Sequence, residues 1–340
     1  MGTVHRTAAD FLCGQFKRRS RARHHSVKAG GKSSNSGKIV PKMLVPTPKG
    51  PASYSIKSIV LATDFLASST LALEYAMAFA SHYRARLLLV HAFELTQAAR
   101  GAESFGHTQS VLRKDRQTRL ESMAARVGRA GITTDFSLVE GPLTQAVVSV
   151  ATQQAADLLV LGTHGIHRGI AHLLIGSNTE ALLQSAPCPT LTIGRHVLGG
   201  LGLKLEFKKI LYMSDFTTEA ATAARYAVLL GQEFGASVDV CHLLPDSAIN
   251  NSEVQRQLAH EYCEAVKRIL PSAEHDWCAP AYQLRKTALA EQILERAKVD
   301  EAGLIVLGMK TETHLGQHLH TNVVYQILAK AACPILTVRA

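Results

Sequence analysis

The sequence predicts an α/β protein built from two tandem, doubly wound domains, each a parallel sheet with helices on both faces. Two observations predict this class: one stretch of sequence recurs in the second half, and short apolar runs alternate with longer helical patterns. The 340-residue length agrees, because one domain takes roughly 100–200 residues. The composition, 46% hydrophobic and 19% charged, excludes a wholly disordered, collagen-like or coiled-coil chain.

The internal repeat sets the expected domain boundaries. Each half contains an apolar run ending in Asp-Phe, a short apolar run ending in glycine, and a Cys-Pro pair before the last apolar run. The matching segments are 56–65 with 207–216, 159–162 with 305–308, and 187–193 with 332–338. A repeat of this length indicates a duplicated domain rather than a solenoid. We expect a first domain at 51–198 and a second at 199–340, beginning at the glycine-rich segment 199–202.

Apolar runs rich in Leu and β-branched residues predict the strands of each domain. In the first domain the expected strands are 57–62, 86–92, 133–139, 157–162 and 189–194. In the second domain, residues 238–242 predict a strand, and apolar residues at helical spacing from Val254 to Ile269 predict a helix. Strands separated by helices need right-handed crossovers, which give a parallel sheet. The uninterrupted apolar runs agree, because a central parallel strand is buried on both faces.

The net charge of +10 comes from the first 50 residues. This segment holds eleven Lys or Arg and one acid, whereas the rest of the chain carries equal numbers of bases and acids. A neutral body offers no overall positive field to a phosphate backbone, so we expect no nucleic-acid partner. Residues 1–50 predict a disordered basic tail, because their composition cannot build a core. The alternative is that translation begins at Met43, which would remove most of these bases.

Membrane, disulfide and metal-binding classes receive no support from the sequence. No window approaches the roughly 18 apolar residues of a membrane-spanning helix. The cysteines are scattered, with no Cys-x-x-Cys pair and no secretory signal before them, which favours a cytoplasmic protein. Cys188 and Cys333 hold matching places in the repeat and are expected to be buried small side chains. We expect no metal site, because the two histidine groups lack a complete ligand set; they are His164, His167 and His172, and His314, His318 and His320.

A ligand site is expected at the loops after the first and fourth strands, because ligands of such sheets bind beyond the carboxyl ends of the strands. The residues in question are Ala62, Thr63 and Asp64 in one loop, and Gly162, Gly165, Gly176, Ser177 and Asn178 in the other. Glycines let the backbone approach a ligand closely. Ser177 and Glu180 have the spacing of a capping box, which would start a helix whose free amides favour a phosphate. The alternative is that the glycines only form turns and Ser177 only caps a helix.

Taken together, these motifs resemble the universal stress protein family in its tandem, two-domain form. The resemblance rests on Thr-Asp-Phe after the first strand, His91 at the end of the second, Gly-Thr-His-Gly at 162–165, Gly-Ser at 176–177 and Pro-Cys-Pro at 187–189. It covers about residues 54–194 and 205–340. It implies a five-stranded sheet of order 3-2-1-4-5 in each domain.

The resemblance also implies bound ATP, with or without Mg²⁺. Nucleotide-binding members of the family carry Gly-x-x-Gly, nine residues, and then Gly-Ser or Gly-Thr. The matching residues here are Gly162, Gly165, Gly176 and Ser177, with ten residues in the gap. By the same resemblance, Asp64 would contact the ribose or the adenine, and the main chain of Ala92 would contact the base. The alternative for Asp64 is that it caps the helix that follows.

The second domain departs from this pattern. It keeps Ser-Asp-Phe at 214–216, but Gly308 is followed by Met309, and Thr-Asn at 321–322 stands where Gly-Ser is expected. Side chains therefore occupy positions where the backbone would approach a phosphate. We expect this domain to have lost the ATP site, or to bind a different ligand, and to serve mainly as a packing partner.

The resemblance therefore implies a cytoplasmic nucleotide-binding protein of the stress response, with ATP in the first domain and a regulatory role. No catalytic residues are expected, although slow ATP hydrolysis is compatible with such a site. The alternative function is a scaffold of the same fold that binds no nucleotide and serves pairing and docking. The two domains are expected to pair within the chain, with a homodimer as a further option and no membrane partner.

Overall fold

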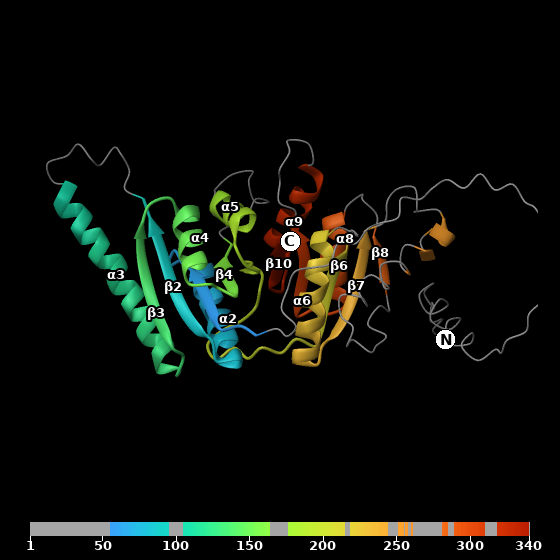
Figure 1. Ribbon diagram of the computed structural model, residues 1–340, viewed down its shortest axis with the longest axis horizontal. Coiled ribbons are helices and arrows are strands. Elements are labelled where there is room, and N and C mark those ends of the chain that lie inside the picture. Colours follow the sequence, from blue (N-terminus) through green and yellow to red (C-terminus); the bar gives the residue numbers. More distant parts are fainter. Residues whose placement is uncertain are drawn as a thin grey trace, which may run out of the picture.

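The computed structural model describes most of the chain from residue 55 onward (Figure 1). The described residues are 55–94, 105–163, 176–214, 218–243, 251–254, 256–257, 260, 281–284, 289–309 and 318–339. The basic segment 1–50 lies outside them, as does most of the helix expected at 254–269.

The first half alternates strands and helices along the chain. Its elements are β1 (Ser58–Ala62), α2 (Ala67–Tyr83), β2 (Arg86–Phe93), α3 (Phe105–Arg129), β3 (Thr134–Glu140), α4 (Leu143–Gln153), β4 (Leu158–Gly162), α5 (Ser177–Ser185) and β5 (Thr190–Ile193). All five strands expected from the sequence are present, each within one residue of its predicted ends.

The second half repeats this alternation. Its elements are β6 (Lys209–Ser214), α6 (Thr218–Phe234), β7 (Ser237–Leu243), β8 (Ala281–Leu284), α8 (Leu289–Val299), β9 (Leu304–Met309), α9 (His318–Lys330) and β10 (Ile335–Arg339). The strand expected at 238–242 is β7.

All ten strands form one sheet, in the order β3-β2-β1-β4-β5-β10-β9-β6-β7-β8. Pairing within each half is parallel, and each half has the order 3-2-1-4-5 when its own strands are numbered along the chain. The halves join through the antiparallel pair β5 and β10, in which Leu191 lies opposite Leu336. The predicted class of two doubly wound α/β domains is confirmed, and their union in a single sheet is a further finding.

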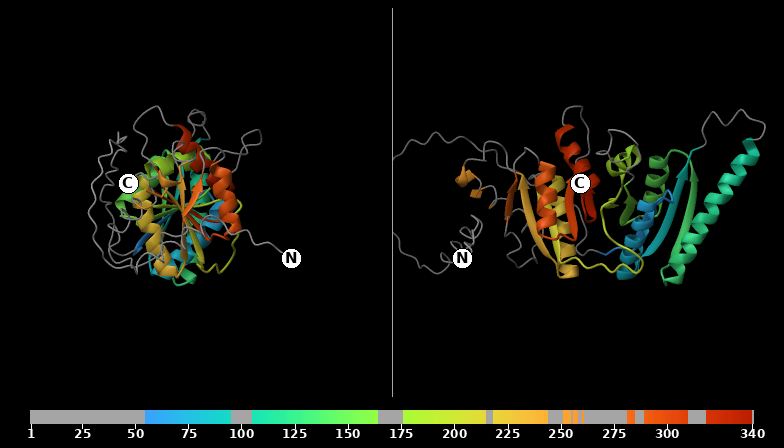
Figure 2. Two further views of the ribbon diagram at one scale, coloured as in Figure 1. Left: turned by 90° about the vertical axis from the view of Figure 1, so that its right-hand side faces the viewer. Right: turned by 180° about the vertical axis from the view of Figure 1, so that it is seen from behind.

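Helices cover both faces of the sheet, as the view along its long axis shows (Figure 2). In the first half, α2 and α3 bury Phe79 and Leu120 against one face, while α4 and α5 bury Val147 and Leu182 against the other. Every residue of β4 is buried. A strand covered on both faces has no solvent-facing positions, which explains the uninterrupted apolar run in its sequence.

An aromatic cluster links α2 to α6 across the junction of the halves. Phe207, in the connecting segment, lies with its ring centroid 6.2 Å from that of Phe79 and 4.8 Å from that of Phe234. His82 stacks on Phe234 at 4.7 Å, and its Nε2 lies 2.8 Å from Oε1 of Glu233. One continuous core cluster contains residues of both halves. The two halves are therefore paired within the chain.

Among the described helices, none combines the length and apolar character needed to cross a bilayer.

Candidate functional site

The two loops singled out by the sequence leave the sheet side by side. Strands β1 and β4 are neighbours, with Ala62 paired to Leu161, so the residues that follow them emerge at the same edge. A Cβ placed on Gly162 would lie 2.6 Å from the backbone carbon of Ser68, just inside α2. Only glycine permits that approach. The ends of both strands and the start of α2 therefore meet at one place.

Asp64 shapes the turn between β1 and α2. Its Oδ1 accepts hydrogen bonds from the Leu66 N–H (3.0 Å) and the Ser69 hydroxyl (2.6 Å). The N-cap position of α2 belongs to Leu66, with no side-chain cap bond, so the reading of Asp64 as the N-cap residue is wrong. Its half-buried carboxylate instead orders the turn ahead of the helix.

The residue after Asp64 has an uncommon backbone conformation. Phe65 has a φ of 67°, in the left-handed region that bulky side chains seldom adopt. Its N–H donates to Thr63 Oγ1 (3.1 Å), and its ring centroid lies 4.4 Å from that of His91. Strained residues of this kind cluster at ligand sites. No pattern in the sequence pointed to this one.

His91 ties the end of β2 to the same turn. Its Nδ1 donates to the Thr63 carbonyl (2.8 Å), which requires the proton to be on Nδ1. Burial lowers the pKa of His91, and the nearby charges of Arg116 and Arg119 act in the same direction, while the Thr63 hydrogen bond and the Asp64 carboxylate oppose them. The imidazole is therefore neutral near pH 7.

Ala92 lies inside β2, where it pairs with Val139 of β3. Peptide groups along a strand point alternately to its two sides. The Val90 carbonyl accepts the Thr63 N–H on the β1 side, so the peptide groups of Ala92 face that side too. Because β1 has ended there, they point toward the space beside the Asp64 turn. A ligand at this edge could meet them, in the place where the base was expected.

Helix α5 begins at Ser177, and its cap differs from the expected one. Gly176 is the N-cap residue, so the cap has no side chain that could bind the first amides. The first helical hydrogen bond runs from the Glu180 N–H to the Gly176 carbonyl (3.1 Å). The predicted capping box is therefore wrong, because Ser177 is the first helical residue rather than the cap. Gly165 lies outside the described residues.

The start of α5 carries amides suited to an anion. The N–H groups of Ser177, Asn178 and Thr179 precede any acceptor within the helix. The Ser177 and Asn178 side chains are exposed. Since α5 leads back to the beginning of β5, which runs parallel to β4, its own beginning lies at the carboxyl edge of the sheet. Such a helix end favours negative charge.

The corresponding helix of the second half is longer. The repeat aligns Gly176 and Ser177 with Thr321 and Asn322, yet α9 already begins at His318. The amides equivalent to the free ones of α5 therefore lie inside α9, where carbonyls one turn earlier accept them. The extra turn leaves no free first-turn amides at that position.

The structure describes only some of the other motif residues of the second half. A Cβ on Gly308 would lie 2.4 Å from the backbone carbon of Glu219, so this glycine repeats the packing role of Gly162. Met309 is buried. Asp215 lies outside the described residues.

The described residues contain no group of three or more His, Cys, Asp or Glu side chains that could hold a metal ion. The side chains of both histidine groups fall outside this part of the chain. The described cysteines, Cys188, Cys241 and Cys333, are free thiols, and burial raises the pKa of each to about 12. Cys333 is buried as expected, whereas Cys188 is only half-buried.

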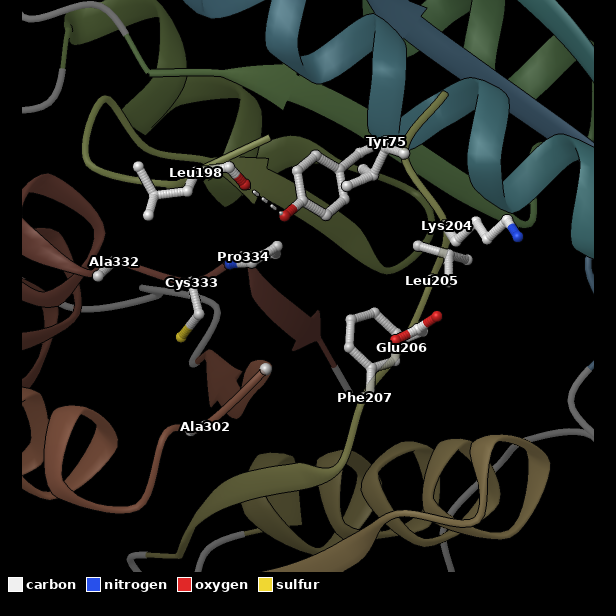
Figure 3. Close-up of a pocket in the computed structure, with 12 residues that line it drawn as sticks. Tyr75, Leu198, Lys204, Leu205, Glu206, Phe207, Ala302, Ala332, Cys333 and Pro334 are labelled. Atoms are coloured by element: carbon white, nitrogen blue, oxygen red, sulfur yellow. Dashed lines mark hydrogen bonds between the residues drawn. The ribbon is translucent and has the colours of Figure 1, made fainter. Parts of the chain in front are cut away.

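A pocket of about 220 Å³ lies at the junction of the two halves, away from the carboxyl edge (Figure 3). Tyr75 of α2, the connecting segment 203–207 and Cys333 are among its lining. The Tyr75 hydroxyl donates to the Leu198 carbonyl (3.2 Å), and burial raises the pKa of Tyr75 to about 12. None of the residues expected to contact a nucleotide lines this pocket.

Comparison with known proteins gives two matches to one family. The sequence model described as "Universal stress protein family" matches residues 55–194 and again residues 206–339. A universal stress protein of Thermus aquaticus, named for the QAH/OAS sulfhydrylase 3′ region, is 32% identical over 139 residues, which are 40% of this chain and 98% of that protein. Universal stress protein MJ0531 of Methanocaldococcus jannaschii is 26% identical over 140 residues, 40% of this chain and 81% of its own length.

Solved structures show the same two-domain fold. A universal stress protein from Archaeoglobus fulgidus superimposes with a TM-score of 0.66 at 15% identity, covering 85% of this chain and 98% of its own. The protein PA1789 of Pseudomonas aeruginosa gives a TM-score of 0.57 at 16% identity, covering 84% of this chain and 92% of its own.

Proposed function

The chain belongs to the universal stress protein family, and from that premise we propose that its first half binds one molecule of ATP with Mg²⁺ at the carboxyl edge of β1 and β4. The first-turn amides of α5 would hold the phosphates, with Gly162 and Gly165 at the loop between. Asp64 would accept hydrogens from the ribose or the adenine, and the backbone of Ala92 would meet the base. Bound Mg²⁺ would neutralise phosphate charge through oxygen ligands.

The observation that carries the proposal is the difference between α5 and α9. In the first half, Gly176 ends a loop and the amides of Ser177 and Asn178 open the helix at the carboxyl edge. In the second half, α9 has an additional turn before the equivalent residues. This difference supports one nucleotide per chain rather than two.

We further propose a regulatory role in the cytoplasm rather than catalysis. A carboxylate that orders a turn, as Asp64 does, and a neutral His91 whose Nδ1 proton is engaged by a carbonyl are poor candidates for a general base. The expected hydrolysis of ATP is therefore far below the roughly 1–10³ per second of ordinary enzymes. Turnover in that range would contradict this part of the proposal.

A second candidate function is a scaffold that binds no nucleotide. It is supported by the pairing of β5 with β10, which joins the two halves through contacts of the chain itself. Binding measurements separate the two candidates.

The test is isothermal titration of the full chain with ATP and Mg²⁺. We expect one site per chain. The variant Ser177→Glu should keep α5 folded, because a negative side chain is favourable at a helix start, but its charge should repel the phosphates. We expect ATP to bind at least tenfold more weakly, which corresponds to a loss of about 1.4 kcal/mol of binding free energy. Asn322→Glu, the matched change in α9, should leave the titration unaltered.

Two equivalent sites, or equal weakening by both variants, would contradict the assignment to the first half. No heat and no rise in melting temperature with ATP would favour the scaffold. A ligand present at one hundred times its dissociation constant should add about 2.7 kcal/mol to stability, which a melting experiment detects readily.

A further inference from the structure

Helix α3 is the outermost helix of the first half and runs beside β3 and β2 (Figure 2). Three of its arginines, spaced three residues apart, each contact the end of a different strand or the turn after it. These contacts are Arg113 with Glu140 of β3 (Nη1 to Oε2, 3.7 Å), Arg116 with the Phe93 ring of β2 (4.8 Å from the guanidinium carbon to the centroid) and Arg119 with the Phe65 ring after β1 (5.8 Å). The helix thereby brings three positive charges to one edge of the sheet.

Only one of these arginines is left without an acidic partner in the described part of the chain. Arg113 pairs with Glu140, and Arg119 pairs with Asp115 (Nε to Oδ2, 3.0 Å). Among the described residues Arg116 makes no ion pair, and its Nη1 is buried without a hydrogen-bond acceptor. A buried donor left unsatisfied destabilises the folded protein. An acceptor supplied by a ligand would offset that cost.

The surroundings of Arg116 favour an anion. The guanidinium lies over the Phe93 ring, and a cation–π contact of this kind fixes its position. The charges of Arg116 and Arg119 also help to lower the pKa of His91, so their field reaches the neighbouring buried groups. The Asp64 carboxylate opposes that field, and Glu140 and Asp115 offset Arg113 and Arg119, so Arg116 is the base whose charge and oriented donor remain for an oxyanion.

We propose that Arg116 anchors a second phosphate-binding site, at the carboxyl ends of β2 and β3. Its ligand is a small phosphorylated molecule or free phosphate, bound through paired guanidinium N–H groups. The site lies next to Ala92, the proposed contact of the base, but β2 is two strands away from β4, so the site is about 10 Å at the usual spacing from the start of α5 that would hold the phosphates of ATP. It does not depend on the binding of ATP.

Phosphate suits this site better than a carboxylate does. A phosphate dianion gains more than a monoanion from several nearby bases, because the Coulomb energy scales with its charge. Arg113 and Arg119 add to that attraction even though each already has a partner. Acetate therefore serves as the weak-binding comparison.

The test is isothermal titration of the full chain with inorganic phosphate at constant ionic strength, adjusted with sodium chloride. The Ser177→Glu variant serves as the background, since it opposes phosphate at α5. We expect saturable binding that persists in this background, and at least about tenfold weaker binding when Arg116→Gln is added, because one charged hydrogen bond is worth roughly 1.5–3 kcal/mol. Arg113→Gln removes the same charge from the same helix and should change the affinity less than threefold.

Two further measurements complete the design. Arg116→Lys keeps the positive charge but loses the planar pair of guanidinium donors, so we expect it to bind phosphate with an affinity between those of the wild type and Arg116→Gln. Far-ultraviolet circular dichroism and melting temperature verify that each variant is folded. Binding that survives Arg116→Gln, or that disappears with Ser177→Glu alone, would overturn the proposal, as would acetate binding as tight as phosphate. Each of these outcomes can be told apart from a failure of ATP binding, which is measured in the wild-type background.

Discussion

Gly162 and Gly308 occupy matching positions in the two halves, the last residue of β4 and the last but one of β9, and each packs against the backbone at the start of a helix. A Cβ would lie 2.6 Å from the Ser68 carbon in one case and 2.4 Å from the Glu219 carbon in the other. Because both contacts are with backbone, no side-chain rotation relieves them. Packing alone therefore requires this glycine, also in the half that has lost the rest of the loop motif.

The first prediction concerns these glycines. Gly162→Ala and Gly308→Ala should each lower the free energy of unfolding by about 1–3 kcal/mol, the usual cost of overpacking. Urea denaturation measures the change. Gly128→Ala is the control: no heavy atom lies within 4 Å of its Cβ position in α3, so it should raise stability by about 0.5–1 kcal/mol. An unchanged midpoint for Gly162→Ala would contradict the packing argument.

The second prediction separates the two roles of Asp64. Asp64→Asn keeps an oxygen that can accept from the Leu66 N–H and the Ser69 hydroxyl, so stability should change by less than about 0.5 kcal/mol. Asp64→Ala loses both bonds and should cost about 1–3 kcal/mol at roughly 0.5–1.5 per bond. Ser69→Ala removes one bond without removing charge. Denaturation measures stability and titration measures ATP affinity, and equal stability of the Asn and Ala variants would refute the structural role.

The third prediction is a dependence of stability on pH through His91. Its pKa in the folded protein is lowered below the unfolded value of about 6.5. The stability that the neutral His91 contributes is fully present above about pH 6.5 and is lost as the pH falls through its lower pKa in the folded protein. The reason is that the unfolded chain then binds a proton that the folded chain does not. The slope for one such group is at most about 1.4 kcal/mol per pH unit.

The comparison variant for this effect is His91→Gln, which retains an N–H donor for the Thr63 carbonyl and cannot titrate. Urea denaturation between about pH 8 and pH 5 should give a steeper loss of stability for the wild type than for the variant. Parallel curves would mean that His91 titrates alike in the folded and unfolded states.

The fourth prediction concerns the junction. Phe207→Ala should destabilise the protein by about 3–5 kcal/mol, the cost of deleting a buried aromatic ring. Its ring contacts both Phe79 and Phe234, so the change should also weaken the coupling of the halves. Calorimetry should then show a broader or divided transition. Val299→Ala, at a side chain 68% exposed, should shift stability by no more than about 0.5 kcal/mol.

The strands of the first half could be predicted from sequence to within a residue, and for β1, β2 and β4 the reason is a largely buried, mostly apolar run. β3, in contrast, mixes polar and apolar residues, and none of them is fully buried. The run Leu158–Gly162 is wholly buried, and its sequence contains no polar position. The adjacency of the Asp64 and Gly162 loops also followed from topology, since both follow strands of one parallel sheet.

Helix starts and single backbone conformations could not be predicted, because several residue types are compatible with each of them. Gly and Ser both serve as N-caps, so the sequence could not tell whether α5 starts with Gly176 or with Ser177 as its cap. Positive φ is usually marked by Gly or Asn, and at Phe65 it is held by contacts with Thr63 and His91 instead. The extra turn of α9, residues 318–320, stands where the repeat has residues 173–175 ahead of Gly176, and the repeat itself does not mark where the helix begins.

Two further features needed the structure. Strand β5 is the last of its half and would be an edge strand, yet all four of its residues are buried, the two threonines included. Such an edge requires a partner, which is β10. The spacing of Arg113, Arg116 and Arg119 likewise places them on one side of a helix. Their positions relative to the strand ends required the structure.

The union of β5 with β10 inside one polypeptide fixes the stoichiometry of the halves at one to one, and dilution cannot separate them. In an assembly of identical chains, every amino-acid replacement is duplicated across the symmetry axis. Here each replacement appears once. Selection can therefore reshape one half while the other stays as it is, which is how a molecule with repeated architecture comes to have an asymmetric surface.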